Sequence, residues 1–358
     1  MGYRLRNSAR RSNLLRQNVS LREIAVLASV DISTASRALN HDIRVSTERA
    51  AHIRKVAERV GYRPRPLRSK SARAVGLLVC LNNEDRPVED YLVRIACLTQ
   101  SQLASRNLHA NLERVPCGLP IRLPAVVTQN RVDGVILSGH PPVELIDGLR
   151  ALAVPAVAIN DTVERLRISC VRSNPEPAMR EAILQLAARG HESFALMAGN
   201  FDYPTIQARY RSYQQALREI EIQPRNEWLV SAISPDIVGG AEGARLLRNR
   251  GELPTAILCE NDWMALGAVQ FLQREGVHIP WDVSVVGHDD MWICEQMSPP
   301  LTSIHRNEDE IVGRAIDLLL EEMESEGPSV PREVLLNGKL MWRGSSGPAS
   351  QRISELAT

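Results

Sequence analysis

Apolar residues recur with a helical period near the beginning of the chain. Within residues 21–28 they stand three and four positions apart, which predicts a short helix. After a tight turn, a second short helix is predicted over residues 32–39, with Asp31 as its N-cap. The same spacing recurs in residues 46–60 and stops before Gly61, which predicts a third helix. Two short helices joined by a tight turn, with a third to complete a small core, are typical of a helix-turn-helix unit.

From residue 74 onward, short and almost continuous apolar runs alternate with helical patterns. The apolar runs cover residues 75–80, 132–137, 156–159, 194–197, 256–259 and 283–286. The helical patterns between them include residues 91–104, 178–188, 210–219, 241–247 and 263–274. Such runs are typical of buried parallel strands, and their alternation with helices predicts doubly wound parallel sheets. Because about 270 residues are too many for one such sheet, we expect two lobes with a cleft between them.

The predicted fold is therefore a small all-α helix-turn-helix headpiece followed by a two-lobed α/β domain. The expected segments are a basic N-terminal extension (1–18), the headpiece (19–63), a shortened linker (64–73), the two-lobed domain (74–343) and a flexible tail (344–358). We expect the first lobe to comprise residues 74–161 and 302–328, and the second lobe residues 162–301 and 329–343. Each lobe is then built from two separate stretches of the chain.

The net charge of +1 conceals an uneven distribution. Residues 1–73 contain 17 Lys and Arg but only 5 Asp and Glu, so they carry +12, while the remainder carries −11. Positive charge gathered at one end is typical of a module that binds a polyanion, because contacts to phosphates release counterions and so supply affinity. The alternative is a basic tail that only improves solubility. The helix-turn-helix pattern in the same segment favours DNA binding.

Composition places the chain among ordinary globular proteins, with 44% apolar and 24% charged residues. The sequence contains no apolar run long enough to predict a membrane span. Because the first twenty residues also lack the apolar region of a secretory signal, we expect a cytoplasmic location. The six cysteines have no zinc-binding spacing, and in that reducing compartment we expect them to be small buried apolar residues.

The sequence carries no familiar enzyme motif. It contains no phosphate-binding P-loop and no nucleophile elbow, and His191-Glu192 lacks the second histidine of a zinc-protease motif. The eight histidines show no metal-binding spacing. We therefore expect no catalytic residues, no metal and no cofactor.

One continuous stretch of the headpiece resembles a known family. Residues 19–40 have the sequence VSLREIAVLASVDISTASRALN, followed by RVS at 44–46 and VGYRP at 60–64. This pattern resembles the DNA-binding headpiece of the LacI/GalR transcriptional regulators. The resemblance implies base contacts from Ile32, Ser33 and Arg37, and phosphate contacts from Ser20, Thr34, Ser36, Asn40 and Arg44.

Physical chemistry supports part of this assignment. Arg37 can donate two hydrogen bonds to O6 and N7 of guanine, which is worth about 1–3 kcal/mol of discrimination between bases. Ile32 can make only apolar contact, for instance with the methyl group of thymine. A solvated helix face is the alternative role for each of these residues. Because two-fold symmetric operators require a dimer, the expected partners are palindromic double-stranded DNA and a second copy of the chain.

The linker departs from the family pattern. The family continues with a hinge helix that ends in a leucine inserted into the minor groove, whereas this linker is shorter. Pro66 can begin a helix but cannot lie inside one. Leu67 is the large apolar residue available to insert between bases, so we take it as the candidate minor-groove contact. The alternative is a basic, flexible tether that contacts phosphates.

Five motifs in the body extend the resemblance. They are ARGH at 188–191, ARYRSY at 208–213, ENDWMALGA at 260–268, IPWDVSVVGHDD at 279–290 and PPLTSI at 299–304. These motifs resemble the sensor domain of the same family, whose fold is similar to periplasmic binding proteins and whose effector lies between two lobes. The residues that match its effector contacts are Asp161, Arg209, Asn261 and Asp289.

The chemistry of these four residues fits a sugar-like ligand. Asp161, Asn261 and Asp289 each follow an apolar strand directly, and ligands bind at the carboxyl ends of strands in open α/β sheets. A guanidinium, an amide and two carboxylates can make paired hydrogen bonds to neighbouring hydroxyl groups. The alternative roles are a salt bridge between the lobes or a helix cap.

Two further groups of side chains are candidates near the cleft. Three arginines lie near the expected crossover between the lobes: Arg165, Arg167 and Arg172. An acidic effector, such as a sugar acid or a phosphate, is favoured if one of them faces the cleft, and otherwise they are surface residues. Three aromatic side chains can either stack on a ring or pack within the fold: Tyr91, Trp263 and Trp292.

Together these features indicate a sequence-specific transcriptional regulator, in the first place a repressor, whose operator affinity is controlled by a small carbohydrate-like effector. We expect it to be associated with the nucleoid in the cytoplasm. The alternative is a cytoplasmic sugar-binding or sugar-processing α/β protein without a gene-regulatory role. The headpiece and the missing catalytic motifs disfavour that alternative.

Overall fold

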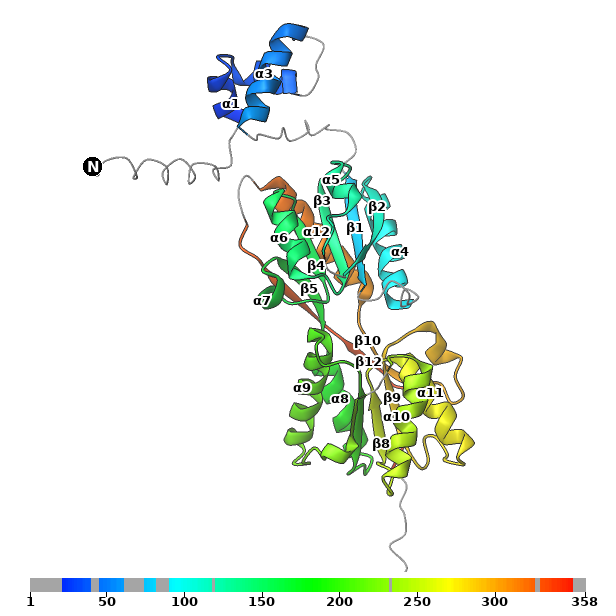
Figure 1. Cartoon of the computed structure of the whole chain (residues 1–358). Coiled ribbons are helices and arrows are strands. Elements are labelled where there is room, and N and C mark those ends of the chain that lie inside the picture. The colour runs from blue at the N-terminus through cyan, green and yellow to red at the C-terminus, as the bar shows by residue number, and fades with distance from the viewer. Residues whose placement is uncertain are drawn as a thin grey trace, which may run out of the picture. The chain divides into compact units, whose positions relative to one another are not determined.

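The chain divides into two compact units, residues 1–71 and residues 72–358, which we call the headpiece and the body (Figure 1). The computed structural model describes residues 21–39, 45–60, 74–81, 90–117, 120–231, 234–325 and 329–349. Among these residues, no helix is both long and apolar enough to cross a lipid bilayer.

The headpiece contains the three predicted helices. They are α1 (Leu21–Leu27), α2 (Ile32–Leu39) and α3 (Thr47–Arg59). The small core between them is made of Ile24, Ala25, Ala28, Ala35, Ala38, Leu39, Ala50, Ile53, Val56 and Ala57. Arg54 of α3 also donates a hydrogen bond to the carbonyl of Ala38, near the end of α2 (3.3 Å). The spacing of apolar residues therefore predicted both the helices and the face that each one buries.

The first lobe of the body is built on a six-stranded parallel sheet with the order β11-β5-β4-β3-β1-β2. Its strands are β1 (Ala74–Leu81), β2 (His109–Pro116), β3 (Gly134–Gly139), β4 (Ala156–Ile159), β5 (Ser169–Asn174) and β11 (Glu333–Asn337). One face is covered by α4 (Asp90–Ser105) and α12 (Glu308–Glu324). The other is covered by α5 (Ala125–Thr128), α6 (Val143–Ala151) and α7 (Val163–Leu166).

The second lobe repeats this arrangement with the strand order β12-β10-β9-β8-β6-β7. Its strands are β6 (Phe194–Ala198), β7 (Leu229–Ser231), β8 (Ala256–Cys259), β9 (Ser284–Asp289), β10 (Thr302–His305) and β12 (Lys339–Met341). Its helices are α8 (Glu176–Ala187), α9 (Pro204–Glu219), α10 (Ile237–Asn249) and α11 (Asp262–Arg274), with short 3-10 turns at Asn226–Trp228 and Trp292–Glu295. Only the pairing of β12 with β10 is antiparallel among the described strand pairs of this sheet.

The limits that we predicted for the lobes are wrong at three strands. β5 was expected in the second lobe but pairs with β4, and β10 was expected in the first lobe but pairs with β9. β11 was expected in the second lobe, and it pairs with β5 in the first. These errors arose because none of the three segments was predicted as a strand, and because hydrophobic periodicity does not show which strands pair. The chain crosses between the lobes after β5, after β10 and between β11 and β12 (Figure 1).

The predicted flexible tail is also wrong in its first part. Ser345 is fully buried, its Oγ donates to the carbonyl of Val285 (2.6 Å), and its own carbonyl accepts from the Val285 N–H (2.8 Å). Further along, the Ala349 N–H donates to the carbonyl of Arg189 (2.9 Å). Residues 344–349 therefore pack against the second lobe, although their Gly, Ser and Pro content predicted a loose segment. The rest of the predicted tail, 350–358, lies outside the described residues.

Each sheet has a switch point, where successive strands are added on opposite sides of the first strand. β1 lies between β2 and β3 in the first lobe, and β6 lies between β7 and β8 in the second. Ligands of open α/β sheets bind outside the carboxyl ends of the strands at such points. We therefore look for a binding site among the residues that follow the carboxyl ends of the strands in both sheets.

Candidate functional sites

Asp31 caps the second helix of the headpiece, as predicted. Its carboxylate accepts from the Thr34 N–H (2.8 Å), the Thr34 hydroxyl (2.6 Å) and the Ser33 hydroxyl (2.5 Å). These hydrogen bonds, that of Ser33 first, hold the pKa of Asp31 well below its usual range. The cap fixes where α2 begins and occupies the hydroxyl hydrogens of both Ser33 and Thr34.

The outer face of α2 carries the residues that we predicted to contact DNA. Ser33 and Arg37 are exposed, and Ile32 is 44% exposed although it is apolar. Thr34 and Ser36 lie at the border between this face and the core. The remaining predicted contacts, Ser20, Asn40, Arg44 and Leu67, lie outside the described residues. Their roles on DNA stay predictions.

A buried charge cluster lies at the carboxyl ends of the strands in the second lobe. Arg209 of α9 and Arg306, which follows β10, both donate to Oδ1 of Asp289, at 3.2 and 2.9 Å. All three residues are less than a tenth exposed. Arg209 also donates to the backbone carbonyl of Glu260, directly after β8. The structure thus brings together two of the four residues predicted for the effector, Arg209 and Asp289.

Asp289 holds an unusual backbone conformation. Its φ angle is 103°, in the region that favours glycine. Such a conformation costs about 1–3 kcal/mol and persists only where the surrounding structure fixes it. Residues of this kind gather at binding and active sites. The strain therefore supports a functional role for the end of β9.

Residues of the first lobe complete this cluster. The guanidinium of Arg306 lies over the ring of Tyr91 in α4, 4.1 Å from its centroid. The amide of Asn160, which follows β4, donates to the Tyr91 hydroxyl. A second contact between the lobes joins the rings of His140 and Tyr203, whose centroids are 4.7 Å apart. Arg306 and Tyr91 therefore connect the lobes through their side chains.

Burial and charge shift several pKa values in the cluster. Burial lowers the pKa of Arg209, which Asp289 partly offsets, and burial raises that of Tyr91 to about 12. Burial alone would lower the pKa of Arg306, but the nearby Tyr91 and Asp289 have a larger effect, so the pKa of Arg306 is raised. Burial, together with the two arginines, lowers the pKa of His288 well below its usual value, so His288 is neutral near pH 7.

A small recess opens beside these groups. Its cavity volume is about 10 Å³, which is room for about one water molecule. We call it the arginine recess, and its lining residues are Ser173, Pro175, Thr205, Arg209, His288 and Arg306. Three buried polar atoms of this lining have no hydrogen-bond partner: Ser173 Oγ, His288 Nδ1 and Arg306 Nε. Buried polar atoms are normally paired, and a cavity of this size lets one water molecule or one polar group of a ligand bond to them.

Asp161 does not join the cluster. Its side chain is 1% exposed and pairs with Arg165, four residues later, whose Nε lies 2.9 Å from Oδ1. The same oxygen accepts from the Thr162 N–H (2.7 Å). Of the other arginines near the predicted crossover, Arg172 pairs with Glu333 (3.3 Å). Asp161 and Glu333 thus pair with Arg165 and Arg172 within the first lobe.

Asn261 caps α11. Its Oδ1 accepts from the Met264 N–H (2.8 Å), and its Nδ2 donates to the carbonyl of Pro235 (3.0 Å). This is the alternative role that the sequence left open. An amide has two N–H groups, and the bond to Pro235 uses one of them, so the cap leaves a second N–H at the end of β8.

The analysis of the sequence missed Arg306. This residue directly follows β10, whose sequence is TSIH. Because three of these four residues are polar, residues 302–305 were not predicted as a strand, and the residue at their end was not considered. Of the three aromatic candidates, Tyr91 stacks on Arg306, whereas Trp292 is 69% exposed.

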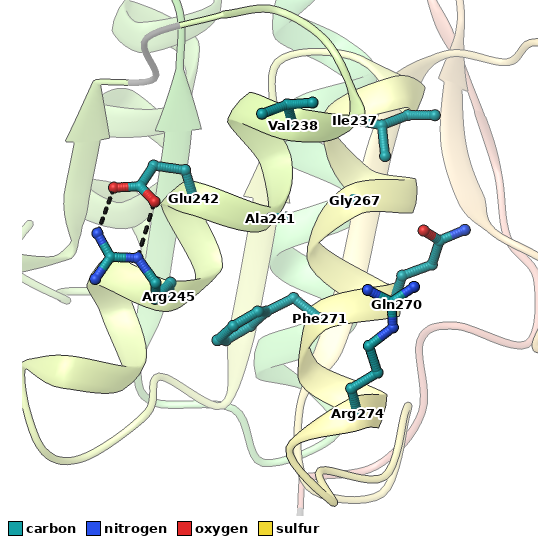
Figure 2. A pocket seen from close by; sticks show the side chains of 9 residues that line it. All are labelled: Ile237, Val238, Ala241, Glu242, Arg245, Gly267, Gln270, Phe271 and Arg274. Atoms are coloured by element: carbon teal, nitrogen blue, oxygen red, sulfur yellow. Dashed lines mark hydrogen bonds and ion pairs between the residues drawn. The ribbon is translucent and has the colours of Figure 1, made fainter.

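A groove of about 380 Å³ runs along the outside of the second lobe between α10 and α11 (Figure 2). Ile237 and Val238 lie at one end of it and are 37% and 74% exposed. The helices approach closely because Gly240 and Gly267 lack side chains; a Cβ on Gly267 would stand 2.0 Å from the carbonyl oxygen of Ile237. Exposed aliphatic residues beside a groove are typical of a protein contact.

No group of three or more His, Cys, Asp or Glu side chains in the described part of the chain is arranged to hold a metal ion. Some buried acids of the body accept hydrogen bonds from neighbouring donors. Asp262, for example, accepts from the Ser303 hydroxyl (2.6 Å) and from the Met291 N–H (2.7 Å).

Two family models match the chain. Residues 20–65 match the bacterial regulatory proteins of the lacI family, and residues 183–346 match a periplasmic binding protein-like domain. The first match contains the described helices of the headpiece, and the second contains Arg209, Asn261, Asp289 and Arg306. Tyr91 and Asn160, the first-lobe residues of the cluster, lie outside both matches.

Curated proteins resemble the chain over most of their length. The ribose operon repressor of Haemophilus influenzae is 27% identical and covers 86% of this chain and 92% of its own length. The probable repressor ExuR of Bacillus subtilis is 26% identical over 91% of this chain and 98% of its own length. A solved complex of the regulator CelR with cellobiose has a TM-score of 0.66 at 25% identity, covering 91% of this chain and 99% of the other. The whole architecture, from headpiece to second lobe, is shared with these proteins.

Proposed function

The chain belongs to the LacI family of bacterial regulatory proteins, and from that premise we propose that it is a transcriptional repressor whose affinity for operator DNA is set by a small molecule bound in the body. The observation that carries this proposal is the exposed face of α2, where Ile32, Ser33 and Arg37 stand on a helix capped by Asp31. The relatives named above are repressors, which supports the same function. The headpiece favours this function over sugar binding or processing without a regulatory role.

On DNA, we propose that α2 enters the major groove. Arg37 donates to guanine, and Ile32 makes apolar contact with a thymine methyl. While its hydrogen is bonded to Asp31, Ser33 can only accept, so it suits the amino groups of adenine or cytosine. The proposed phosphate contacts are Ser20, Thr34, Ser36, Asn40 and Arg44, and the proposed minor-groove contact is Leu67.

In the body, we propose that Arg209, Asp289 and the second amide hydrogen of Asn261 bind the effector. An effector contact from Asp161 stays a prediction. Its place just after β4 supports the contact, but in this structure its carboxylate pairs with Arg165. Arg306 bonds to Asp289 and stacks on Tyr91 of the other lobe. An effector that binds one arrangement of the lobes more tightly than the other shifts their populations, and through them the spacing of two headpieces.

Two-fold operators require two headpieces, and we propose that the second copy docks on the groove between α10 and α11 (Figure 2). The exposed Val238 and Ile237 supply apolar area, and the pair between Glu242 and Arg245 (2.6 Å) lies along the groove. Val238→Asp would then lower the dimer fraction in equilibrium sedimentation. An unchanged fraction contradicts this choice of surface.

We propose that the body binds a small molecule without converting it, because the sequence carries no familiar enzyme motif. The relatives are named repressors rather than enzymes. Because the proposed partner is chromosomal DNA, we propose that the protein acts in the cytoplasm, at the nucleoid.

The experiment that tests this function is selection of binding sites from random double-stranded DNA by the full chain. We expect a palindromic sequence to be enriched, and Arg37→Ala to lose that preference while keeping weak, salt-sensitive binding. The expected loss at the selected site is about 1–3 kcal/mol, measured by mobility shift. Arg22→Ala on α1 is the matched control, since it removes an exposed charge outside α2. Enrichment of no palindrome, or unchanged preference in Arg37→Ala, would refute the proposal.

A further inference from the structure

We propose that Cys80 and Cys117, in the first lobe, form a dithiol that a peroxide oxidises to a disulfide. This modification site does not depend on the proposed function. The sequence predicted small buried cysteines, and four of the six are buried, but Cys117 is half-buried and Cys97 is exposed. Cys117 is therefore accessible to a small reagent.

The two cysteines belong to neighbouring strands and lie on the same face of the sheet. Cys80 is the last residue but one of β1, and in the parallel pairing of β1 with β2 it lies opposite Val115. Cys117 comes two residues after Val115, and side chains two positions apart point to the same side of a strand. Cys80 and Val115 belong to one core cluster, and Cys117 packs against it. Both thiols are thus directed to the same place.

The side chain of Cys117 lies across the carboxyl end of β1. Its N–H donates to the carbonyl of Leu81 in β1 (3.0 Å), and its Sγ donates to the carbonyl of His140, which follows β3 (3.4 Å). The N–H of His140 in turn donates to the carbonyl of Cys80 (3.0 Å). Because β1 lies between β2 and β3, a side chain that reaches from the end of β2 to His140 passes over the end of β1. There the thiol of Cys80 donates a hydrogen bond to the sulfur of Cys117.

The surroundings of the two thiols give them different roles. The hydrogen bond from Cys80 lowers the pKa of Cys117, and the positive charge of Arg165 also lowers it, although partial burial opposes both. Arg165 is held nearby, because its Nη2 donates to the carbonyl of Pro141, the residue after His140 (2.8 Å). The contact with Cys117 and burial raise the pKa of Cys80. Cys117 is therefore the thiol that ionises and attacks, while Cys80 keeps its proton.

The reaction takes place in two steps. The Cys117 thiolate attacks one oxygen of the peroxide, so an S–O bond forms and the O–O bond breaks. This step leaves a sulfenic acid on Cys117 and a hydroxide, which takes up the proton that Cys117 released. The sulfur of Cys80 then attacks the Cys117 sulfur, and the hydroxyl group leaves as water with the proton of Cys80. The two thiols lose two electrons and two protons, and hydrogen peroxide is reduced to two molecules of water.

The disulfide constrains a long segment of the chain. It joins residues 80 and 117 into a closed loop, which removes conformations from the unfolded chain and so stabilises the folded state. It also fixes Cys80, whose carbonyl accepts from His140, and the ring of His140 packs against Tyr203 of the second lobe. Disulfides in reducing compartments are usually transient and redox-sensing. The site is thus placed beside a contact between the lobes.

The test is oxidation of the reduced full chain with a small excess of hydrogen peroxide, followed by mass spectrometry and by alkylation of the free thiols. We expect a chain lighter by two hydrogen atoms, alkylation of the other four cysteines, and a digest fragment that joins Cys80 to Cys117. A dithiol reductant should restore all six thiols. The melting temperature should rise on oxidation and fall on reduction. Six alkylated cysteines, or a disulfide through Cys97 in place of this pair, would overturn the proposal.

Substitutions separate the attacking thiol from its partner. In Cys117→Ser, no disulfide should form and peroxide should leave the melting temperature unchanged. Cys80→Ala keeps an apolar side chain in the core and removes the second thiol, so the Cys117 sulfenic acid should accumulate and be captured by dimedone. Cys97→Ser is the matched control, since it removes an exposed thiol from α4 and should oxidise as the wild type does. A disulfide that persists in Cys117→Ser, or the absence of sulfenic acid in Cys80→Ala, contradicts the proposal.

Discussion

Two carboxylates occupy equivalent places in the two lobes and have different surroundings. Asp161 comes just after β4 in the first lobe, and Asp289 is the last residue of β9 in the second. Asp161 pairs with Arg165, four residues away in the same lobe. Asp289 pairs with Arg209, 80 residues before it, and with Arg306, 17 residues after it.

The difference teaches that a position at the end of a strand does not by itself make a binding residue. The partner of Asp161 is close in sequence, because the short helix α7 follows β4 after three residues and contains Arg165. The partners of Asp289 arrive from α9 and from the crossover after β10, and one of them reaches Tyr91 in the other lobe. Only Asp289 therefore connects to both lobes and to a recess with unpaired donors.

Replacing Asp289 should have the largest effect. Asp289→Ala leaves two buried guanidinium groups without their carboxylate, which is expected to cost about 3–5 kcal/mol of unfolding free energy. Urea denaturation followed by tryptophan fluorescence measures it, because all five tryptophans lie in the second lobe: Trp228, Trp263, Trp281, Trp292 and Trp342. Asp289→Asn, which keeps an acceptor oxygen, should cost less. Equal stability of Asp289→Ala and wild type would show that the pairs contribute nothing.

Replacing Asp161 should have a smaller effect. Asp161→Ala leaves Arg165, whose side chain is 25% exposed and can turn toward water, so we expect a loss of about 1–3 kcal/mol. Since Asp161 is satisfied within its own lobe, the thermal shift produced by the effector should remain. If the variant is stable but its melting temperature no longer rises with the effector, Asp161 binds the effector. The two carboxylates would then have the same role.

Replacing Asn261 should have the smallest effect on stability. Asn261→Ala removes the N-cap of α11, which is expected to cost about 0.5–2 kcal/mol. Asn261→Asp keeps the cap but removes both amide hydrogens, the one bonded to the carbonyl of Pro235 and the one that we propose for the effector. Stability close to wild type in Asn261→Asp, with a weakened effector response, would separate the two roles of this residue. A full response in both variants leaves it as a cap alone.

Much of the fold followed from the sequence. The helices of the headpiece and the buried strands β1, β3, β4, β6, β8 and β9 were predicted from periodicity, because each is buried along a continuous face. β2 was missed because it is an edge strand with alternating exposure, and β11 and β12 are half-exposed. β10 is buried but was missed because its sequence, TSIH, is mostly polar. For a strand at an edge, solvent on one side removes the continuous apolar signal.

The sequence by itself determined the headpiece, the recognition helix with its cap at Asp31, and the identity of Arg209 and Asp289 as candidates. Local spacing carries that information, because a helix face or a cap is set by residues a few positions apart. Only the tertiary structure decided which lobe each crossover strand joins, which arginine meets which carboxylate, and that Arg306 faces the same recess as Arg209. Those contacts join residues 17 to 80 positions apart, and pairing over such distances is set by sheet order and packing, which periodicity does not contain.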